Sequence, residues 1–268
     1  MNQNITFIGG GNMASAIIGG IINSGLASKD QITATAKTTA TCSSLAERFG
    51  IHTTQDNGKA AETADILFLA VKPFLFPEVI PQIKDKVKKD ALIISIAAGQ
   101  PIATIESLFG HPIKLIRTMP NTPALVSEAM SALCVNDNVT EEELSTAIDI
   151  FNSFGKCEVV KESLMDVVTG VSGSSPAYVY MFIEAMADAA VADGMPRAQA
   201  YKFAAQSVLG SAKMVLETGT HPGALKDAVC SPAGTTIEAV AVLEEKGLRN
   251  AVISAQRACT KKSKDMSK

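Results

Sequence analysis

The chain has 268 residues, a formal net charge of −3 and 47% hydrophobic residues, which is enough for one large domain or two smaller ones with a substantial core. The slightly acidic balance, the absence of Trp and the low aromatic content (5%) argue against nucleic acid or an anionic membrane as the main partner. The five cysteines form no C-x-x-C pair, and no leader or membrane-spanning run is recognisable, so we expect a soluble, cytoplasmic protein with reduced thiols and no metal site.

The N-terminal segment carries the most informative motif. Residues Ile5 to Ile8 predict a short buried strand, and Met13 to Ile22 predict a helix that ends near Gly25. The turn between them has the pattern G-x-G-x-x-A, made by Gly9, Gly11 and Ala14. Such a turn lets a pyrophosphate approach the backbone at a helix start, where free N–H groups and the helix dipole favour an anion. We predict a dinucleotide site here; an ordinary structural turn is the alternative.

The second strand, predicted over Gln31 to Ala36, bears on the choice of cofactor. Enzymes that use NAD place an acidic residue near the end of this strand to bind the ribose 2′-hydroxyl. Here the strand ends in Ala-Lys-Thr-Thr, and no acid follows until Glu47. Lys37 and the two threonines after it can instead hold a 2′-phosphate, so the sequence favours NADPH over NADH. The alternative for Lys37 is an ordinary solvated loop lysine.

Strands and helices alternate through the rest of this half. Three continuous apolar runs predict strands buried on both faces, at Asp65–Val71, 91–98 and 113–119. Helical spacing is found at 42–49, 76–87 and 102–109. This alternation is typical of a doubly wound, mostly parallel sheet, in which ligands bind beyond the carboxyl ends of the strands.

Two further strands and one helix complete the first half. The segments Met130–Val135 and 157–160 have the pattern of edge strands. Between them Thr140 and Glu143 form a capping box, which predicts a helix that runs to Phe154. We expect no chemistry in this part of the chain.

The residue pattern changes at Glu162, where strand-like runs stop and apolar residues recur at helical spacing. We therefore predict a dinucleotide-binding domain at 1–161 and a helical substrate-binding and dimerisation domain at 162–268. The predicted helices cover 167–191, 198–217, 236–245 and 248–261. These helices carry more apolar surface than they can bury against one another, so we expect a homodimer or a higher homo-oligomer. The basic tail from Lys261 is predicted to fray.

Two small-residue segments interrupt the helical half. Val171–Pro176 lies inside an apolar pattern, which indicates close approach either to a ligand or to another helix. Val229–Ile237 leads into a helix whose start has small residues and hydroxyls, and its N–H groups can bind a small carboxylate. A plain capped helix start is the alternative for this second segment.

The residues that are missing help to define the reaction. Reduction of a ketone needs a proton donor at the oxygen, usually His, Lys or Tyr. Of the three histidines, His52 and His111 fall in predicted loops of the nucleotide half, and the interrupted helix has no lysine between Lys161 and Lys202. An imine nitrogen can already carry a proton near neutral pH. The sequence therefore favours reduction of C=N over reduction of C=O.

At this point the chain resembles the pyrroline-5-carboxylate reductase family over nearly its whole length. The resemblance rests on the following segments: FIGGGNM at 7–13, AVKP at 70–73, SIAAG at 95–99, RTMPNTP at 117–123, GVSGSSPAY at 170–178 and SPAGTT at 231–236. It implies an N-terminal Rossmann domain, a C-terminal helical domain that interlocks in a dimer, and NAD(P)H-dependent reduction of 1-pyrroline-5-carboxylate to L-proline, the last step of proline synthesis.

The resemblance also implies roles for individual residues. Those that would line the pyrophosphate are Ile8, Gly9, Gly10, Gly11, Asn12 and Met13. Asn57 would contact the cofactor ribose, and the cofactor would be bordered by Ala70, Val71, Lys72, Pro73, Ile96, Ala97 and Ala98. The substrate carboxylate would be bound by Ser231, Gly234, Thr235 and Thr236. Thr236 would lie near the ring nitrogen and is the expected catalytic residue, while Asp227, Ala228 and Glu162 match positions near the substrate.

Two departures from the family pattern leave alternatives open. The loop at Lys37 varies in the family, so the cofactor preference stays undecided between NADPH and NADH. Ala233 stands where glycine is frequent. Competing functions are a related imine or hydroxyacid reductase with another small carboxylate substrate, and a nucleotide-binding regulator without turnover.

Overall fold

The computed structural model describes residues 1–266, which form two compact units. The first unit comprises Met1–Ser174 together with the chain from Cys259 on, and the second comprises Ser175–Ala258. The domain boundary between residues 161 and 162 rests on the change in residue pattern, and it stays a prediction.

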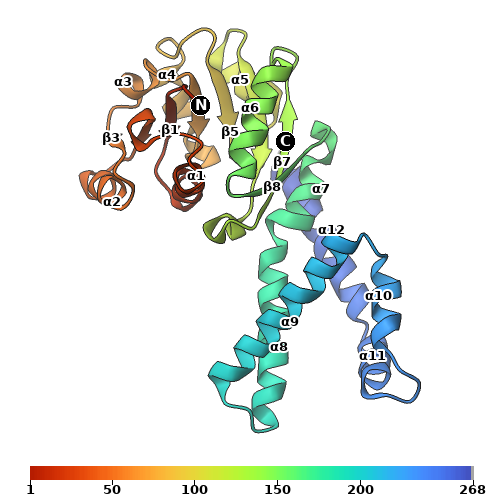
Figure 1. Cartoon of the computed structure of the whole chain (residues 1–268). Coiled ribbons are helices and arrows are strands. Elements are labelled where there is room, and N and C mark those ends of the chain that lie inside the picture. The colour runs from red at the N-terminus through yellow and green to blue at the C-terminus, as the bar shows by residue number, and fades with distance from the viewer. Residues whose placement is uncertain (267–268) are drawn as a thin grey trace. The chain divides into compact units, whose positions relative to one another are not determined.

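Within the described residues, the first unit holds one eight-stranded sheet with the order β3-β2-β1-β4-β5-β6-β7-β8 (Figure 1). The strands are β1 (Ile5–Ile8), β2 (Ile32–Thr35), β3 (His52–Thr54), β4 (Ile66–Leu69), β5 (Leu92–Ser95), β6 (Lys114–Met119), β7 (Ala129–Val135) and β8 (Gly155–Val159). In the order of the sheet, all strands from β3 through β2, β1, β4 and β5 to β6 are parallel, and β7 runs antiparallel to β6. The predicted Rossmann-type, mostly parallel sheet is therefore confirmed, and the strand order reverses between β1 and β4.

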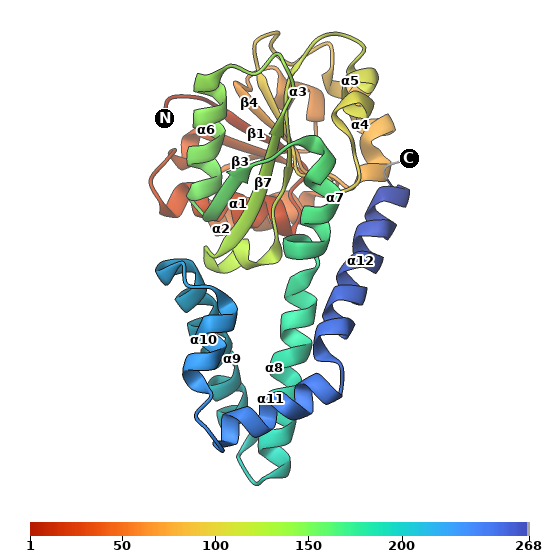
Figure 2. The same cartoon turned by 90° about the vertical axis from the view of Figure 1, so that its right-hand side faces the viewer.

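Helices cover both faces of this sheet (Figure 2). They are α1 (Asn12–Asn23), α2 (Thr39–Phe49), α3 (Asn57–Ala61), α4 (Phe76–Ile83), α5 (Ile102–Phe109), α6 (Glu141–Asn152) and α7 (Met165–Val168). Short 3-10 turns are η1 (Lys29–Gln31), η2 (Pro73–Leu75), η3 (Thr122–Val126) and η4 (Glu162–Leu164), and η5 (Thr169–Gly173) is a π-helical turn. Buried side chains of α1, α2 and α6 pack on one face, and those of α3, α4 and α5 pack on the other.

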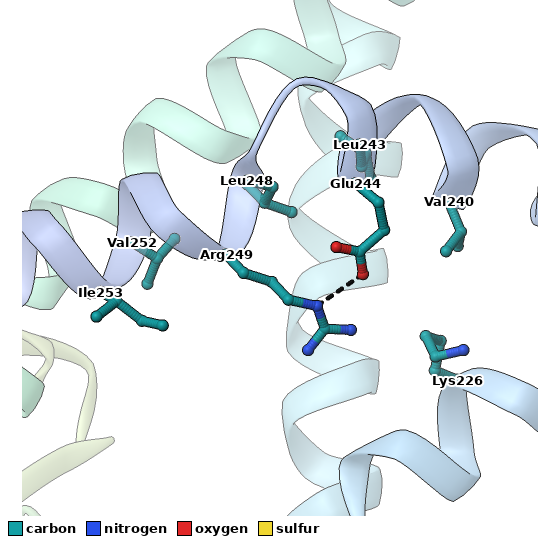
Figure 3. A pocket seen from close by; sticks show the side chains of 8 residues that line it. All are labelled: Lys226, Val240, Leu243, Glu244, Leu248, Arg249, Val252 and Ile253. Atoms are coloured by element: carbon teal, nitrogen blue, oxygen red, sulfur yellow. Dashed lines mark hydrogen bonds and ion pairs between the residues drawn. The ribbon is translucent and has the colours of Figure 1, made fainter.

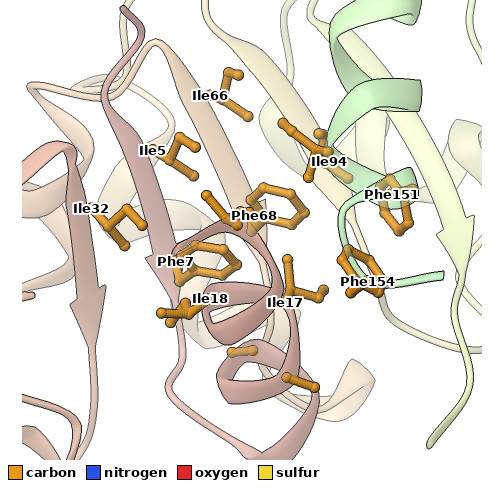
Figure 4. Close-up of a cluster of buried hydrophobic side chains, with 14 of the residues drawn as sticks. Ile5, Phe7, Ile17, Ile18, Ile32, Ile66, Phe68, Ile94, Phe151 and Phe154 are labelled. Atoms are coloured by element: carbon orange, nitrogen blue, oxygen red, sulfur yellow. The ribbon is translucent and has the colours of Figure 1, made fainter. Parts of the chain in front are cut away.

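The apolar runs read as strands are buried on both faces. Phe7 and Phe68 stack with their ring centroids 4.5 Å apart in the core cluster of Figure 4. Ile8, Leu67 and Leu69 point into the cluster on the opposite face. Because both faces are covered, no polar alternation is needed, which explains the continuous apolar sequence.

Most predicted boundaries in this unit hold to within a few residues. The first helix ends at Asn23 and is followed by a Schellman motif with Gly25 in the left-handed region and Leu26 N bonded to Ile21 O (3.1 Å). The capping box at Thr140 and Glu143 is also present. The sequence missed β3 and α3, which are only three and five residues long.

Two expectations about the strands of this unit were wrong. The segment at Met130 was expected to be an edge strand, but β7 is interior, because β8 pairs with its outer side. His52 was expected in a loop, but it opens β3 and pairs with Thr33 in parallel register.

The second unit is built from helices, as predicted. They are α8 (Ser175–Ala192), α9 (Arg197–Thr218), α10 (Pro222–Val229), α11 (Thr235–Glu245) and the first part of α12 (Leu248–Met266). The sequence missed α10. In the described part of this unit, the only residues buried within the single chain are Ala187, Ala200 and Ala204. The unit therefore has almost no core of its own.

The end of α12 belongs to the first unit. The tail from Lys261 was expected to fray, but α12 continues to Met266 (Figure 2); residues 267–268 lie outside the described residues. Ser263 is buried, and its hydroxyl donates to Asp166 Oδ1 at 2.6 Å. Cys259 Sγ lies 3.2 Å from Ser174 Oγ. These contacts fix one face of the helix while its lysines stay exposed.

Candidate cofactor and substrate sites

The glycine turn presents open backbone at the start of α1. Gly9 has a φ of +107°, and a Cβ there would lie 2.7 Å from Ala70 O. A Cβ on Gly10 would lie 2.3 Å from Leu45 Cδ1. Gly11 differs, because a Cβ on it would meet no atom within 4 Å. Gly11 is also the N-cap of α1, and no side chain caps that helix start. The turn thus leaves both space and unpaired N–H groups for an anion.

A cleft of about 650 Å³ opens in front of this turn. It is lined by Gly9, Gly11, Asn12, Met13, Ala14, Ala70, Val71, Lys72, Pro73, Leu75, Ile96, Ala97, Ala98 and Thr122. Most lining residues follow the carboxyl ends of β1, β4 and β5, next to the point between β1 and β4 where the strand order reverses, and Thr122 follows β6. Lys72 is the one charged side chain among them and is exposed. The cleft therefore combines an apolar lining with one positive charge, which suits a dinucleotide.

Most of the residues predicted to bind the cofactor line this one cleft. Four do not: Ile8, which is fully buried in β1, and Gly10, Lys37 and Asn57. The sequence did not single out Leu75 and Thr122, which reach the cleft from η2 and η3. Thr122 lies in the RTMPNTP segment at 117–123, but that segment alone did not assign it to the cleft, because the sheet topology brings both turns there.

Asn57 is connected to the glycine turn through hydrogen bonds. The N–H of Gly9 donates to Thr35 Oγ1 at 3.0 Å, and that hydroxyl donates to Asn57 Oδ1 at 2.6 Å. Asn57 Nδ2 in turn donates to Gln82 Oε1 at 2.9 Å. Thr35 is buried at the end of β2. This relay fixes the turn against the first residues of α3 and against α4.

The loop after β2 contains the predicted 2′-phosphate residues. Lys37 is exposed and has no ion pair within the described part of the chain. Its carbonyl oxygen accepts a hydrogen bond from Gln55 Nε2 at 2.8 Å, which holds the loop backbone. Thr38 caps α2 by accepting from Thr41 N at 3.2 Å. The loop is therefore ordered, and its lysine ammonium is available to an anion.

The second unit presents another uncapped helix start, at α11. Its N-cap is Gly234, and no side chain caps it, so the alternative of a plain capped helix start does not apply. A Cβ on Gly234 would lie 2.3 Å from Ser231 Oγ, so glycine is required while Ser231 keeps this place. Ala233 has a φ of +56°, which costs about 1 kcal/mol for a residue with a Cβ. Thr236 is half-buried, and the structure gives its hydroxyl no hydrogen-bond partner among the described residues.

The other predicted substrate residues are placed as follows. Thr235 is the first residue of α11 and is exposed. Asp227 and Ala228 lie in the last turn of α10, and Asp227 is exposed and paired with Lys226. Glu162 lies in the first unit, where its carboxylate is already engaged.

The partners of Glu162 are both in the first unit. Its Oε1 accepts from the N–H of Ile102 at 2.8 Å and from Arg117 Nη1 at 2.9 Å. Arg117 is buried, with 6% of its surface exposed. Burial raises the pKa of the neighbouring Cys134 thiol, Glu162 raises it further, and Arg117 opposes this rise. Glu162 is thus held between a helix start and a buried guanidinium.

The small residues at 171–176 pack against the end of β6. A Cβ on Gly173 would lie 2.5 Å from Met119 Cε. Asn121 Nδ2 donates to the carbonyl oxygen of Ser172 at 3.1 Å. Another helix also contacts this segment, since Cys259 Sγ of α12 lies 3.2 Å from Ser174 Oγ. Of the two alternatives left open by the sequence, the structure thus supplies the helix, and the tightest approach, at Gly173, is to β6.

An apolar groove of about 550 Å³ lies in the second unit (Figure 3). It is lined by Lys226, Val240, Leu243, Glu244, Leu248, Arg249, Val252 and Ile253. Arg249 Nε donates to Glu244 Oε1 at 2.6 Å, as the dashed line in Figure 3 marks. Val252 and Ile253 remain about half exposed.

Among the described residues, no helix combines the length and the apolar character that crossing a bilayer requires. The same part of the chain holds no group of three or more His, Cys, Asp or Glu side chains placed to bind a metal ion.

Comparisons with known proteins agree with this arrangement. Residues 162–266 match a family model described as pyrroline-5-carboxylate reductase dimerisation, and residues 4–99 match one described as NADP oxidoreductase coenzyme F420-dependent. The pyrroline-5-carboxylate reductase of Escherichia coli K12 is 54% identical over 268 residues, which is 100% of both chains. This chain belongs to the pyrroline-5-carboxylate reductase family.

Solved structures of the family have the same fold. A pyrroline-5-carboxylate reductase from Coxiella burnetii superposes with a TM-score of 0.92 at 37% identity and covers 100% of both chains. The pyrroline carboxylate reductase of Plasmodium falciparum, solved with NADP bound, gives a TM-score of 0.89 at 34% identity and covers 100% of this chain and 99% of its own. The resemblance drawn from the sequence motifs is therefore confirmed over the full length.

Proposed function

We propose that this chain reduces 1-pyrroline-5-carboxylate to L-proline, with NADPH as the preferred reductant and NADH as a possible one, in the last step of proline synthesis. The observation that carries the proposal is the full-length match, at 54% identity, to a pyrroline-5-carboxylate reductase. The two uncapped helix starts, at α1 and α11, support it because each suits an anionic group.

The residues of the cleft fit the dinucleotide. The open space at Gly11 would accommodate the pyrophosphate, and the N–H groups of Asn12 and Met13 would donate hydrogen bonds to its oxygens. Lys72 adds a positive charge, and Lys37 would bind a 2′-phosphate. The remaining predicted residues that line the cleft would supply its apolar walls. Ile8, Gly10 and Asn57 lie outside the lining, and Asn57 would act through its hydrogen bond from Thr35. NADPH supplies a hydride when bound.

The start of α11 would hold the substrate carboxylate. The N–H groups of Thr235 and Thr236 and the hydroxyl of Ser231 are donors for it, and each charge-assisted bond contributes about 1.5–3 kcal/mol. The Thr236 hydroxyl would orient the ring nitrogen. Because a protonated imine carbon is already electrophilic, the site needs no strong general acid. Asp227, Ala228 and Glu162 remain predicted to lie near the substrate.

Turnover tests this function directly. We expect the purified protein to oxidise NADPH when 1-pyrroline-5-carboxylate is added and to form proline in equal amount. A 2-keto acid is the matched control, since a hydroxyacid reductase would use it. Activity with the keto acid alone would contradict the proposal. Binding of NADPH without turnover of either compound would favour the regulator.

We also propose that the chain acts as a homodimer, or a higher homo-oligomer, assembled through residues 162–266. Large apolar side chains of the second unit are exposed in the single chain, among them Phe203, Leu216 and Ile253. The groove of Figure 3 would then be covered by a second copy. Sedimentation equilibrium should give twice the chain mass or a multiple of it; a monomer at micromolar concentration would contradict this assembly.

A cytoplasmic location is part of the same proposal. It is supported by the five cysteines, which are all free thiols in the structure. Fractionation of the source cells should recover the activity with cytoplasmic marker enzymes, and recovery from a membrane or secreted fraction would contradict it.

A further inference from the structure

The loop between β5 and α5 forms one wall of the cofactor cleft through Ile96, Ala97 and Ala98. Its start is fixed by the Thr118 hydroxyl, which donates to the carbonyl oxygen of Ser95 at 2.9 Å. The sheet therefore holds the first end of this loop, and the loop needs an equivalent anchor at its far end.

The far end is anchored by Glu162. The helix α5 begins at Ile102, and its N-cap Pro101 provides no side-chain cap. Glu162, 60 residues further along the chain, accepts from the N–H of Ile102 at 2.8 Å. A helix start has unpaired N–H groups and a partial positive charge, so a carboxylate stabilises it.

The anchor is rigid because Arg117 holds the same carboxylate oxygen. Arg117 Nη1 lies 2.9 Å from Glu162 Oε1, on a strand that pairs with β5 and β7. Since the guanidinium is buried, loss of its partner would leave an uncompensated charge. Thr118 and Arg117 are neighbours on β6, so one strand controls both ends of the loop.

We propose that Glu162 and Arg117 are positioning residues for the cofactor, which fix the loop 96–101 in the shape that NADPH binds. This inference rests on the proposed function in one respect, namely that NADPH occupies the cleft. It assigns Glu162 a different task from the one implied by the family resemblance, which places this residue near the substrate. The two roles give different results when NADPH binding is measured without substrate.

The chain offers a matched control. Glu143 also combines a helix-start bond with an ion pair on β6, since it accepts from the N–H of Thr140 at 3.0 Å and pairs with Lys114 at 2.5 Å. Its helix α6 contributes no residue to the cleft. Glu143→Ala should therefore cost stability in the same way without reaching the cofactor site.

The experiment compares Glu162→Ala, Glu162→Gln and Glu143→Ala by fluorescence titration with NADPH and by hydrogen exchange of the free enzyme. Glu162→Ala should raise the Kd for NADPH about tenfold and speed exchange at residues 96–102. Glu162→Gln keeps an acceptor for Ile102 and should have a smaller effect of the same kind. Glu143→Ala should change the Kd less than about twofold, with faster exchange at α6 alone.

Three results would overturn the inference. The first is an unchanged Kd for NADPH in both Glu162 variants with a raised KM for pyrroline-5-carboxylate, which would make Glu162 a substrate ligand. The second is a rise in Kd of equal size in Glu143→Ala, which would indicate a general loss of stability. The third is unchanged exchange at residues 96–102 in Glu162→Ala, or in Glu162→Gln if the alanine variant does not fold. A wild-type protein that binds no NADPH would instead contradict the proposed function, while the exchange comparison would still test the anchor.

Discussion

The N–H of Gly9 donates to the hydroxyl of Thr35, which is buried at the end of the neighbouring strand β2. Thr35→Val removes this acceptor and leaves a backbone N–H unpaired. We expect a loss of about 1–3 kcal/mol in the free energy of unfolding and a higher Kd for NADPH, measured by urea denaturation and titration. Thr33→Val on the same strand is the control. Equal effects of the two variants would mean that the bond to Gly9 contributes nothing specific.

Gly11→Ala separates cofactor binding from folding. An added Cβ at Gly11 meets open space, and its φ of −77° suits alanine, so stability should change by less than about 0.5 kcal/mol. The methyl group would occupy the approach to the pyrophosphate, so the Kd for NADPH should rise at least tenfold. Gly9→Ala, by contrast, should lower both the affinity for NADPH and the stability of the fold, because φ at Gly9 is +107°. Normal affinity in Gly11→Ala would place the phosphates elsewhere.

Lys37→Ala tests the choice between the two cofactors. If the exposed ammonium binds the 2′-phosphate, the Kd for NADPH should rise about tenfold, while the Kd for NADH should not change. NADH thus serves as the matched ligand, and both values come from the same titration. A parallel loss for the two cofactors would show that Lys37 does not discriminate between them.

Thr236→Ala tests the catalytic role of this residue. Loss of one hydrogen bond to the substrate should lower kcat/KM roughly tenfold to a hundredfold, equivalent to 1–3 kcal/mol. Thr236→Ser keeps a hydroxyl and should retain most of the activity, and neither change should alter the Kd for NADPH. An alanine variant with wild-type kcat/KM would show that Thr236 merely begins a helix.

Ser131→Ala should stabilise the protein. The Ser131 hydroxyl is fully buried on β7, and it has no hydrogen-bond partner among the described residues. Removing it should raise the free energy of unfolding by about 1 kcal/mol. Ser95→Ala is the matched control, since Ser95 Oγ accepts from the N–H of Ala97 at 3.4 Å and its loss should destabilise. A less stable Ser131→Ala would mean that the hydroxyl does have a compensating partner.

The parts of the fold that the sequence predicted are those with strong local signals. Continuous apolar runs that end in glycine or proline located β4, β5 and β6, and the Thr140 capping box located α6. By contrast, β3 and α3 are too short to show a periodicity, and their pairing depends on β2. The interior position of β7 depends on β8, which no local pattern reveals.

The same division applies to the candidate sites. The glycine turn and the start of α11 are contiguous in sequence, so both were located in advance. Thr122 reaches the cleft only through the sheet topology. The bond from Ile102 to Glu162 spans 60 residues and joins a backbone N–H to a side chain. The identity of residue 102 gives no sign of this bond, because every residue except proline has a backbone N–H that could donate it.

The return of α12 to the first unit affects how the polypeptide matures during synthesis. Domains generally fold in the order in which the ribosome releases them. Here the nucleotide-binding unit lacks its contact between Asp166 and Ser263 until the last residues have emerged. The first unit is therefore completed only after the whole helical segment, which lies between its two parts in the sequence, has been synthesised.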